Sequence, residues 1–288
     1  MRLRSRVVLA WLLACSVILS AQQAAPGAGQ QIADGVRLLQ LDDPALLSPT
    51  GPVAVQALRL DPRKVTIRLG VAQGTIPRET VDAIASRQPG VLAAVNAGFF
   101  SLQTGQPTDL MKVDGKVLNG TARPRGAVGI LERRGVTTLL FDRVVVTTRG
   151  DRTEYTTRFG SAPRDWARAA DAISGAGLLL RDGRALTDWS EERISAGFDT
   201  TRHPRTIIGT DAEGMIWLVT VDGRNPEVSL GMSFTELQRL ARRLGLRSAL
   251  NLDGGGSTTM WVDGRIVNTP SDDGGPRKVS DAILVVPR

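Results

Sequence analysis

The segment from Ser248 to Thr259 constrains the fold more than any other part of the chain. An apolar run ends in a carboxylate, Asp253, and three glycines follow at once, Gly254 to Gly256. Such a run bounded by glycine is typical of a buried strand. Glycine also lets a ligand or a second backbone approach the main chain closely. Three glycines exceed the needs of a two-residue turn, so we expect a strand that ends in a functional loop, with Asp253 placed to meet substrate.

Hydroxyl side chains follow these glycines, beginning with Ser257 and Thr258. The sequence Gly-Gly-Gly-Ser-Thr lacks the Gly-x-Ser-x-Gly pattern of a nucleophile elbow. We therefore interpret Ser257 and Thr258 as substrate-binding hydroxyls, with hydrogen bonds to the loop's own backbone as the alternative. The N–H groups of Gly254, Gly255 and Gly256 are expected to face the same substrate.

The N-terminus is typical of a secretory signal peptide. Three arginines precede an apolar run at residues 7–19, and small residues at 20–21 offer a cleavage site. The run is short for a transmembrane helix. We predict a signal peptide at residues 1–21, a mature chain without a transmembrane helix, and export to the periplasm or the medium. Lipid attachment at Cys15 is the alternative.

Removal of the signal peptide changes the cysteine content and the net charge of the chain, and the net charge bears on which partners the chain can bind. Cys15 is the one cysteine, so the mature chain has no disulfide. The 36 basic residues fall by three to 33 against 29 acids, a mild excess without a clustered basic face. This argues against a nucleic-acid partner. An anionic small substrate is compatible with it.

The rest of the chain is expected to form an α+β domain, a single domain of mixed, strand-rich sheet with a few helices. Residues 22–31, rich in Ala, Gln, Gly and Pro, are predicted to be a linker, and residues 32–288 the domain. Short β-branched or apolar runs predict strands, at 53–60, 65–71, 91–95, 128–131, 137–141, 177–180, 206–209 and 216–221. Helices are predicted to begin near Pro77 and at Ser233, where Glu236 completes a capping box for a helix to residue 244.

Polar residues follow several of these strands, at Asn96, at Arg205 and Thr206, and at Asp222 and Arg224. Sites often collect at strand ends, which makes these residues candidates for substrate binding. Guanidinium groups suit phosphate oxygens, whereas structural pairs with carboxylates are the alternative. Asp222 also has a simpler interpretation, because Asp-Gly recurs in this chain as a hairpin-turn signal.

His203 is interpreted as a capped or surface imidazole, because no hydroxyl–imidazole pair is visible in the sequence. A single histidine and no mature cysteine argue against zinc. The sequence leaves open a divalent cation such as calcium, held by Asp253, Asp222 or the 271–273 loop. The metal and cofactor content is otherwise unassigned.

Taken in order, these motifs resemble the phosphodiester glycosidase family, whose mammalian member removes N-acetylglucosamine to uncover mannose 6-phosphate. The resemblance runs from Asn96 to the C-terminus, through Asn96-Ala-Gly-Phe-Phe, His203-Pro-Arg-Thr, Val221-Asp-Gly-Arg, Gly231-Met-Ser-Phe-Thr-Glu-Leu, Asn251-Leu-Asp-Gly-Gly-Gly-Ser-Thr-Thr-Met, Val267-Asn-Thr-Pro-Ser-Asp, Arg277 and Asp281-Ala-Ile-Leu-Val.

The resemblance implies a hydrolase that cleaves a sugar from a sugar-1-phosphodiester or a related envelope glycan. Asp253 and Asp222 are the expected catalytic pair, since a carboxylate stabilises or attacks an oxocarbenium-like centre. Two alternatives remain at this stage. One is a non-catalytic polysaccharide-binding module of the envelope, and the other is a metal-dependent phosphodiesterase that breaks P–O bonds.

Overall fold

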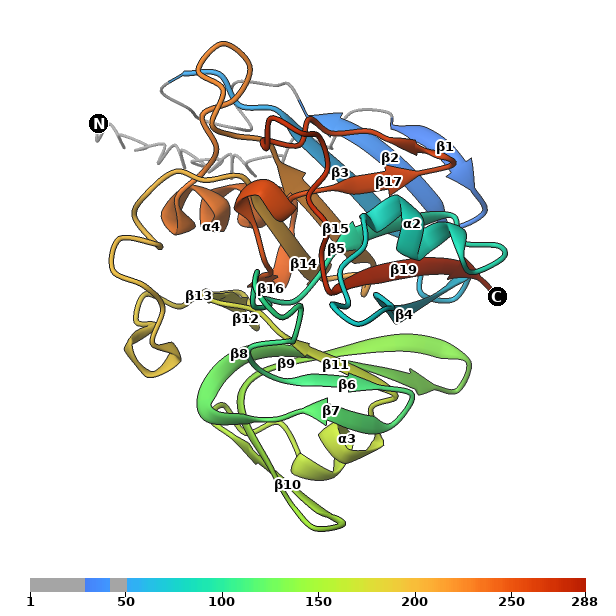
Figure 1. Cartoon of the computed structure of the whole chain (residues 1–288), viewed down its shortest axis with the longest axis vertical. Helices are drawn as coiled ribbons and strands as arrows, with labels where there is room; N and C mark the ends of the chain where they lie inside the picture. Colours follow the sequence, from blue (N-terminus) through green and yellow to red (C-terminus); the bar gives the residue numbers. More distant parts are fainter. Residues whose placement is uncertain (1–28, 42–50) are drawn as a thin grey trace, which may run out of the picture.

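The computed structural model describes residues 29–41 and 51–288. The predicted signal peptide, and the linker up to residue 28, lie outside the described residues. Strands dominate the fold, and three α-helices are present in the described part of the chain. The chain forms three antiparallel sheets that share one core, so the α+β single-domain prediction is confirmed (Figure 1).

The largest sheet has eight strands and carries the segments that end at the candidate site. α4 (Phe234–Arg243) covers its outer face, and Leu237, Leu240 and Ala241 pack there against the sheet. In spatial order the strands are β1 (Gln30–Ala33), β2 (Val36–Leu41), β3 (Val55–Leu60), β15 (Ile216–Val221), β14 (Arg205–Asp211), β16 (Leu246–Asn251), β12 (Leu178–Arg181) and β13 (Arg184–Ala185).

A five-stranded sheet packs on the inner face of the first. α2 (Val81–Ser86) covers its other side through Val81, Ile84 and Ala85. The spatial order is β18 (Arg265–Ile266), β17 (Met260–Val262), β5 (Ala93–Asn96), β19 (Asp281–Pro287) and β4 (Val65–Val71). β19, the last strand in sequence, therefore lies between β5 and β4.

A six-stranded sheet forms the lower part of the molecule in Figure 1. Trp166 of α3 (Pro163–Arg168) is fully buried against it. The spatial order is β10 (Arg152–Thr157), β9 (Val136–Arg149), β8 (Thr121–Arg133), β11 (Asp171–Ser174), β6 (Met111–Val113) and β7 (Lys116–Asn119).

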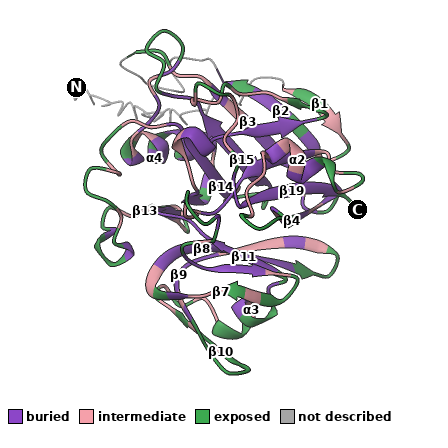
Figure 2. Cartoon of the chain, in the orientation of Figure 1, coloured by how far each residue is buried: buried purple, intermediate pink, exposed green. Residues whose placement is uncertain are grey.

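One apolar cluster joins the three sheets. It includes Leu58 and Leu218 of the first sheet, Val95 and Ile283 of the second, and Val128 of the third. In Figure 2, buried strands run through the centre of the upper part and of the lower part of the molecule. Burial of this surface is the main stabilising term, and it fixes the strand ends that converge at the candidate site.

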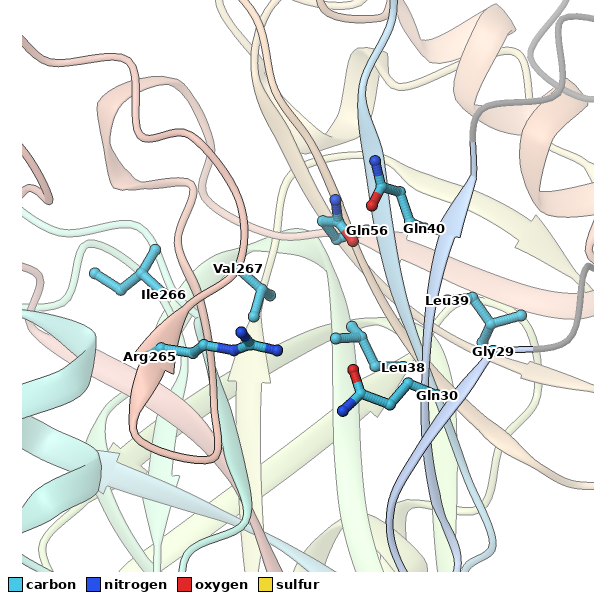
Figure 3. Close-up of a pocket in the computed structure, with 9 residues that line it drawn as sticks. All are labelled: Gly29, Gln30, Leu38, Leu39, Gln40, Gln56, Arg265, Ile266 and Val267. Atoms are coloured by element: carbon cyan, nitrogen blue, oxygen red, sulfur yellow. The ribbon is translucent and has the colours of Figure 1, made fainter.

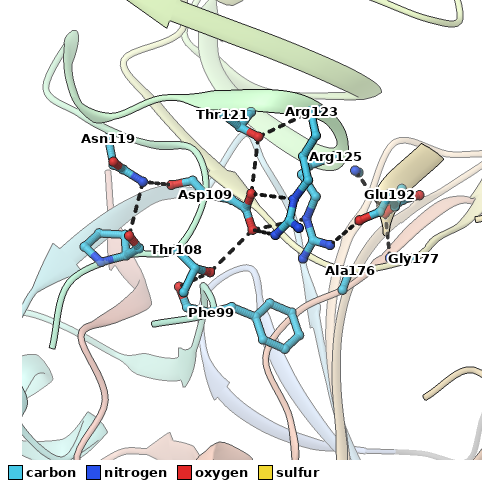
Figure 4. A network of polar contacts seen from close by, with 12 residues as sticks. Phe99, Thr108, Asp109, Asn119, Thr121, Arg123, Arg125, Ala176, Gly177 and Glu192 are labelled. Carbon is cyan, nitrogen blue, oxygen red and sulfur yellow. Dashed lines mark hydrogen bonds and ion pairs between the residues drawn. The ribbon is translucent and has the colours of Figure 1, made fainter. Parts of the chain in front are cut away.

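Buried charges connect the six-stranded sheet to the segment after β5 (Figure 4). Asp109 accepts hydrogen bonds from Arg123 and lies 3.3 Å from Nε of Arg125. Arg125 donates to the carbonyl of Glu192, at the end of the 3-10 helix η1 (Ser190–Glu192). Its guanidinium also lies 5.9 Å from the ring of Phe99. Removing one member would leave a buried charge unpaired, which is strongly destabilising.

Several local predictions are confirmed. The strand at 216–221 has the predicted bounds, and the helix capped by Ser233 carries the predicted capping box with Glu236. The hairpin turn at Arg134 and Gly135 has both residues at positive φ. The linker boundary differs from the prediction, because Gln30 and Gln31 belong to β1 and pair with β2. No helix in the described ranges has the length and apolarity that crossing a bilayer requires.

Candidate functional site

The loop after β16 lies where the eight-stranded and five-stranded sheets meet. The N–H of Asp253 donates to the carbonyl of Ala97 at 2.9 Å, just beyond the end of β5. The Nδ2 of Asn96 donates to the carbonyl of Asp253 at 2.7 Å. Both backbone groups of Asp253 are therefore held by the last residue of β5 and the residue after it, and its carboxylate is placed by a strand from each sheet.

At each of the three glycine positions of this loop, an added Cβ would come closer than 3 Å to a neighbouring residue. A Cβ on Gly254 would lie 2.5 Å from the carbonyl of Pro204, and one on Gly255 would lie 2.9 Å from Nη2 of Arg224. A Cβ on Gly256 would overlap Asp272 and Arg277. Gly255 also has φ of 61°, which favours glycine. The glycines let two arginines approach the loop backbone in η2 (Gly255–Ser257).

The Asp253 carboxyl is partly exposed to solvent but closely surrounded by protein. Burial raises its pKa to about 7, and the nearby Asp281 carboxylate adds to the rise. The Ser257 hydroxyl, the N–H of Gly254 and the charge of Arg277 oppose this rise. A carboxyl with a pKa close to neutrality can hold or release a proton at physiological pH, which suits acid–base work.

Asn96 joins three segments of the site. Its Oδ1 accepts hydrogen bonds from the Thr206 hydroxyl at 2.7 Å and from the N–H of Thr259 at 3.2 Å. Its Nδ2 holds Asp253, as described above. Because Asn96 and Thr206 are both fully buried, their side chains position the loop rather than reach into solvent. The structure thus brings together Asn96, Thr206 and Asp253, as predicted, although the first two lie behind the loop.

Asp222 occupies a different environment from the one expected for a catalytic partner. Its Oδ1 accepts a hydrogen bond from Nδ2 of Asn268, and its Oδ2 accepts one from the N–H of Thr269, both at 2.9 Å. Burial raises its pKa, and these hydrogen bonds oppose the rise. The charges that act on Asp253 are Arg277 and Asp281. The geometry therefore assigns Asp222 to bracing the 268–269 segment.

Asp281 is a site residue that the sequence reasoning did not single out. It begins β19, which pairs with β5, and its Oδ1 accepts from the N–H of Gly98 at 2.5 Å. It is buried, and burial raises its pKa. The signal was available in the sequence, because Asp281 is an acidic residue at the head of an apolar strand.

Arg205 is a buried cation with one free nitrogen. Its Nε donates to the carbonyl of Met232, and its Nη2 donates to the carbonyls of Phe198 and Thr201, at 2.6–2.9 Å. Its guanidinium lies 4.5 Å from the centre of the Phe198 ring. Burial lowers its pKa to about 10. Nη1 has no hydrogen-bond partner among the described residues, so one donor remains for an anion.

Arg224 is more accessible than Arg205. It has φ of 64°, and its side chain is about half exposed. Its Nη1 lies 3.4 Å from the Ser271 hydroxyl and 3.8 Å from Oδ1 of Asp272. Asp272 is already held by Arg277 through two hydrogen bonds of 2.8 and 3.0 Å. Arg224 therefore makes only long contacts here, while its guanidinium adjoins the glycine loop.

A cavity of about 290 Å³ lies on the far side of Arg224. Its lining combines the loop after β15 with the loop after β18, and it includes Asp222, Arg224, Asn225, Thr269, Ser271 and Asp272. The cavity thus extends the polar surface from the Asp253 loop toward residues 269–273.

His203 lies between the two arginines. Its ring stacks on Phe198, with 6.0 Å between ring centres, and its pKa is lowered by burial, by Arg205 and by Arg224. It is therefore an uncharged ring at neutral pH. The predicted hydroxyls Ser257 and Thr258 are fully buried. The Ser257 hydroxyl acts on the Asp253 carboxyl without a well-formed hydrogen bond, and the Thr258 hydroxyl has no partner within the described part of the chain.

The described residues contain no group of three or more His, Cys, Asp or Glu side chains arranged to hold a metal ion. Three acids, Asp253, Asp272 and Asp281, and two arginines, Arg224 and Arg277, lie at the glycine loop, and Arg277 is paired with Asp272. These groups can bind an anion beside a carboxyl that exchanges a proton near neutral pH.

The fold and these groups define an α+β domain with an acid and cation site where two antiparallel sheets meet. The chain belongs to the phosphodiester glycosidase family, whose sequence model matches residues 89–286. The family resemblance expected from the motifs is therefore confirmed, and the matched region contains each predicted site residue.

Curated relatives match the same part of the chain. N-Acetylglucosamine-1-phosphodiester alpha-N-acetylglucosaminidase from Mus musculus is 26% identical over 213 residues, which are 68% of this chain and 38% of that one. The Bos taurus enzyme is 28% identical over 231 residues, 72% of this chain and 39% of that one. The chain thus spans about two fifths of the length of these relatives.

Solved structures share the fold. The catalytic domain of the zebrafish enzyme of the same name, auto-inhibited by its pro-peptide, superimposes with a TM-score of 0.64 at 24% identity, covering 93% of this chain and 87% of that one. A protein from Burkholderia pseudomallei described as exported gives a TM-score of 0.70 at 19% identity, covering 83% of this chain and 74% of that one.

Proposed function

We propose that this protein is a hydrolase that cleaves a sugar from a sugar-1-phosphodiester. The observation that carries the proposal is the position of Asp253, held at both backbone groups by the last residue of β5 and the residue after it, and flanked by arginines across a glycine loop. Membership of the phosphodiester glycosidase family and the relatives that act on N-acetylglucosamine-1-phosphodiesters support it.

In the reaction, the bond between C1 of the sugar and its phosphate oxygen breaks. A new bond forms between C1 and a water oxygen, so the products are a free sugar and a phosphomonoester. Asp253 in its ionised form stabilises or attacks the oxocarbenium-like centre. Arg224 binds the phosphate oxygens. The N–H groups of Gly254 and Gly255 already donate to the Asp253 carboxylate and to the Pro204 carbonyl, which corrects the expectation that they face the substrate.

The second carboxylate of the site is Asp281 in this proposal, in place of Asp222. Asp281 holds the turn at Gly98 and acts electrostatically on Asp253. Its negative charge favours a protonated Asp253, which keeps the pair poised near neutral pH.

The test uses N-acetylglucosamine 1-(methyl phosphate) in water enriched with oxygen-18. The label is expected in the sugar product. Label in the phosphate would mean P–O cleavage and would contradict the proposal, as would the absence of hydrolysis by well-folded protein. The Asp253→Asn variant should lose turnover by at least about 10²-fold.

We further propose that the protein is exported, on the basis of the arginine-led apolar segment at its N-terminus and the likeness in fold to a protein described as exported. An envelope glycan is the corresponding substrate. N-terminal sequencing of native protein is expected to begin near Gln22. An intact Met1 on cytoplasmic protein would contradict export, and an acylated Cys15 would show a lipid anchor.

A further inference from the structure

A second cavity, of about 540 Å³, lies between the first and second sheets, at the edge formed by β1, β2 and β3 (Figure 3). Its volume is within the range of small-molecule sites, about 300–1,000 Å³. One wall comes from the first sheet and the other from β18 and the residue after it. The lining is Gly29, Gln30, Leu38, Leu39, Gln40, Gln56, Arg265, Ile266 and Val267.

The lining has the chemistry of a sugar site. Three amide side chains, of Gln30, Gln40 and Gln56, and the guanidinium of Arg265 supply both donors and acceptors. None of the nine residues carries a carboxylate. Within residues 29–41 and 51–288, these four side chains make no hydrogen bond or ion pair with protein, so their polar groups are available to a ligand.

A row of polar side chains connects this cavity to the Asp253 site. Gln40 lies directly opposite Gln56, Gln56 lies opposite Thr220, and Thr220 lies opposite Thr206. Directly opposed residues of antiparallel strands point to the same face. The Thr206 hydroxyl bonds Asn96, which holds Asp253.

The polar row lies on the inner face of the eight-stranded sheet, which faces the second sheet. On each of these four strands, the residue two positions from the polar one points to the same face and belongs to the core that joins the sheets. These core residues are Leu38, Leu58, Leu218 and Ile208. At the row itself the inner face becomes polar. Thr220 in its middle is buried, and its hydroxyl has no partner among the described residues. Three interstrand steps of ~4.8 Å separate Gln40 from Thr206, a span of about 14 Å.

The segment after β17 provides a second connection. Arg265, Ile266 and Val267 line the 540 Å³ cavity, whereas residues 269–273 line the cavity beside Arg224. Between them, Asn268 bonds Asp222. The two cavities are therefore lined by one continuous stretch of chain.

We propose that the cavity lined by Gln30, Gln40, Gln56 and Arg265 is a second carbohydrate-binding subsite, which holds hydroxyl- and acetamido-bearing sugar units of a longer substrate. The inference rests on the proposed function for the identity of that substrate. Amide side chains match the paired hydroxyl and acetamido groups of an N-acetylated sugar chain, and the guanidinium adds donors without a competing carboxylate.

The test measures binding of chitotetraose, a neutral N-acetylglucosamine tetramer without a phosphodiester, by titration calorimetry. The double variant Gln40→Ala/Gln56→Ala is expected to raise the Kd by at least about tenfold, because hydrogen bonds from two amides are lost. Arg265→Ala, at an exposed position, should weaken binding in the same direction without a risk to folding. Gln31→Ala is the matched control, since Gln31 lies in β1 but outside the lining.

Asp253→Asn should bind the tetramer with unchanged Kd. The proposal of a subsite would be overturned if wild-type protein does not bind the tetramer. It would also be overturned if Gln40→Ala/Gln56→Ala and Arg265→Ala bind the tetramer as tightly as wild type does. Hydrolysis of N-acetylglucosamine 1-(methyl phosphate) is measured separately on wild-type protein. Tetramer binding that depends on the glutamines supports the subsite whether or not the phosphodiester is cleaved, so the two proposals fail independently.

Discussion

The side chain of Asn96 holds the main chain of Asp253 through a hydrogen bond of 2.7 Å that spans 157 residues of sequence. The same side chain accepts hydrogen bonds from Thr206 and Thr259. A single buried amide therefore fixes the position of the candidate catalytic loop relative to the eight-stranded and five-stranded sheets.

The first prediction concerns this amide. Asn96→Ala should lower kcat by about 10²-fold, because misplacement of the loop by about 1 Å is enough for such a loss. The free energy of unfolding should fall by about 1–3 kcal/mol, since buried partners are left unsatisfied. Asn119→Ala is the control. Asn119 also donates to two carbonyls, but away from the site, so its loss should affect stability and leave kcat unchanged. Equal kcat values for the two variants would contradict a positioning role for Asn96.

The second prediction concerns Asp253 and pH. Because the ionised form is required, kcat/KM should rise with pH through about 7, the pKa that burial gives this carboxyl. Stability follows the opposite course. A pKa raised by folding contributes stability that is fully present below the unfolded value of about 3.8 and is lost as pH rises toward 7.

At pH 8 the wild-type protein therefore carries a destabilising charge that Asp253→Asn lacks. We expect the variant to have a higher Tm than wild type at pH 8 and a smaller advantage at pH 4, with a difference in unfolding free energy of at most about 4 kcal/mol. Thermal unfolding at the two pH values measures this. A Tm difference that does not change with pH would mean that the carboxyl titrates normally.

The third prediction separates backbone strain from contact in the glycine loop. Gly255 and Gly264 both have positive φ, but only Gly255 has Arg224 within 4 Å of an added Cβ. Either alanine substitution should cost about 1–2 kcal/mol of stability. Gly255→Ala should also lower kcat/KM by about 10²-fold by displacing the guanidinium. Similar kinetics for both variants would show that Arg224 does not act at the loop.

The fourth prediction distinguishes the two arginines. Arg205→Lys removes a fork that holds three carbonyls in the interior, so it should lower the free energy of unfolding by about 2–4 kcal/mol. Arg224→Lys should leave stability within about 0.5 kcal/mol, as is usual at exposed positions. It should raise KM for the phosphodiester, because lysine keeps the charge and loses the planar fork. Unchanged KM in Arg224→Lys would remove it from the anion site.

The sequence predicted best where the signal was local. The helix capped by Ser233 and the strand ending at Val221 depend on neighbouring residues, and both were found with nearly the observed bounds. Gln30 and Gln31 fall in the predicted linker because that segment is rich in Ala, Gln, Gly and Pro, yet they form the first half of β1 and are ordered by pairing with β2. The pairing partner is a tertiary fact that composition does not contain.

The candidate site likewise combines features that local sequence predicts with features that only the tertiary fold determines. Three glycines predicted a closely packed loop beside Asp253, and atoms of Pro204, Arg224 and Arg277 do lie within 3 Å of where a Cβ would stand at these positions. The partner carboxylate did not follow from sequence. Asp222 and Asp281 both adjoin apolar strands, and only the sheet order places Asp281 next to β5. Arg205 was predicted to bind an anion, whereas three of its hydrogen bonds hold the fold.

The position of β19 has a consequence for how activity is acquired. This strand, at residues 281–287, lies between β5 and β4, so β4 has no partner in the second sheet until residues 281–287 have been synthesised. Asp281 then arrives together with the strand that secures Ala97 and Gly98. Such long-range pairing forms slowly. A nascent chain lacking residues 281–287 would hold its loops without the strand that aligns them, so the proposed hydrolysis should begin only after these residues have been made and have paired with β5 and β4.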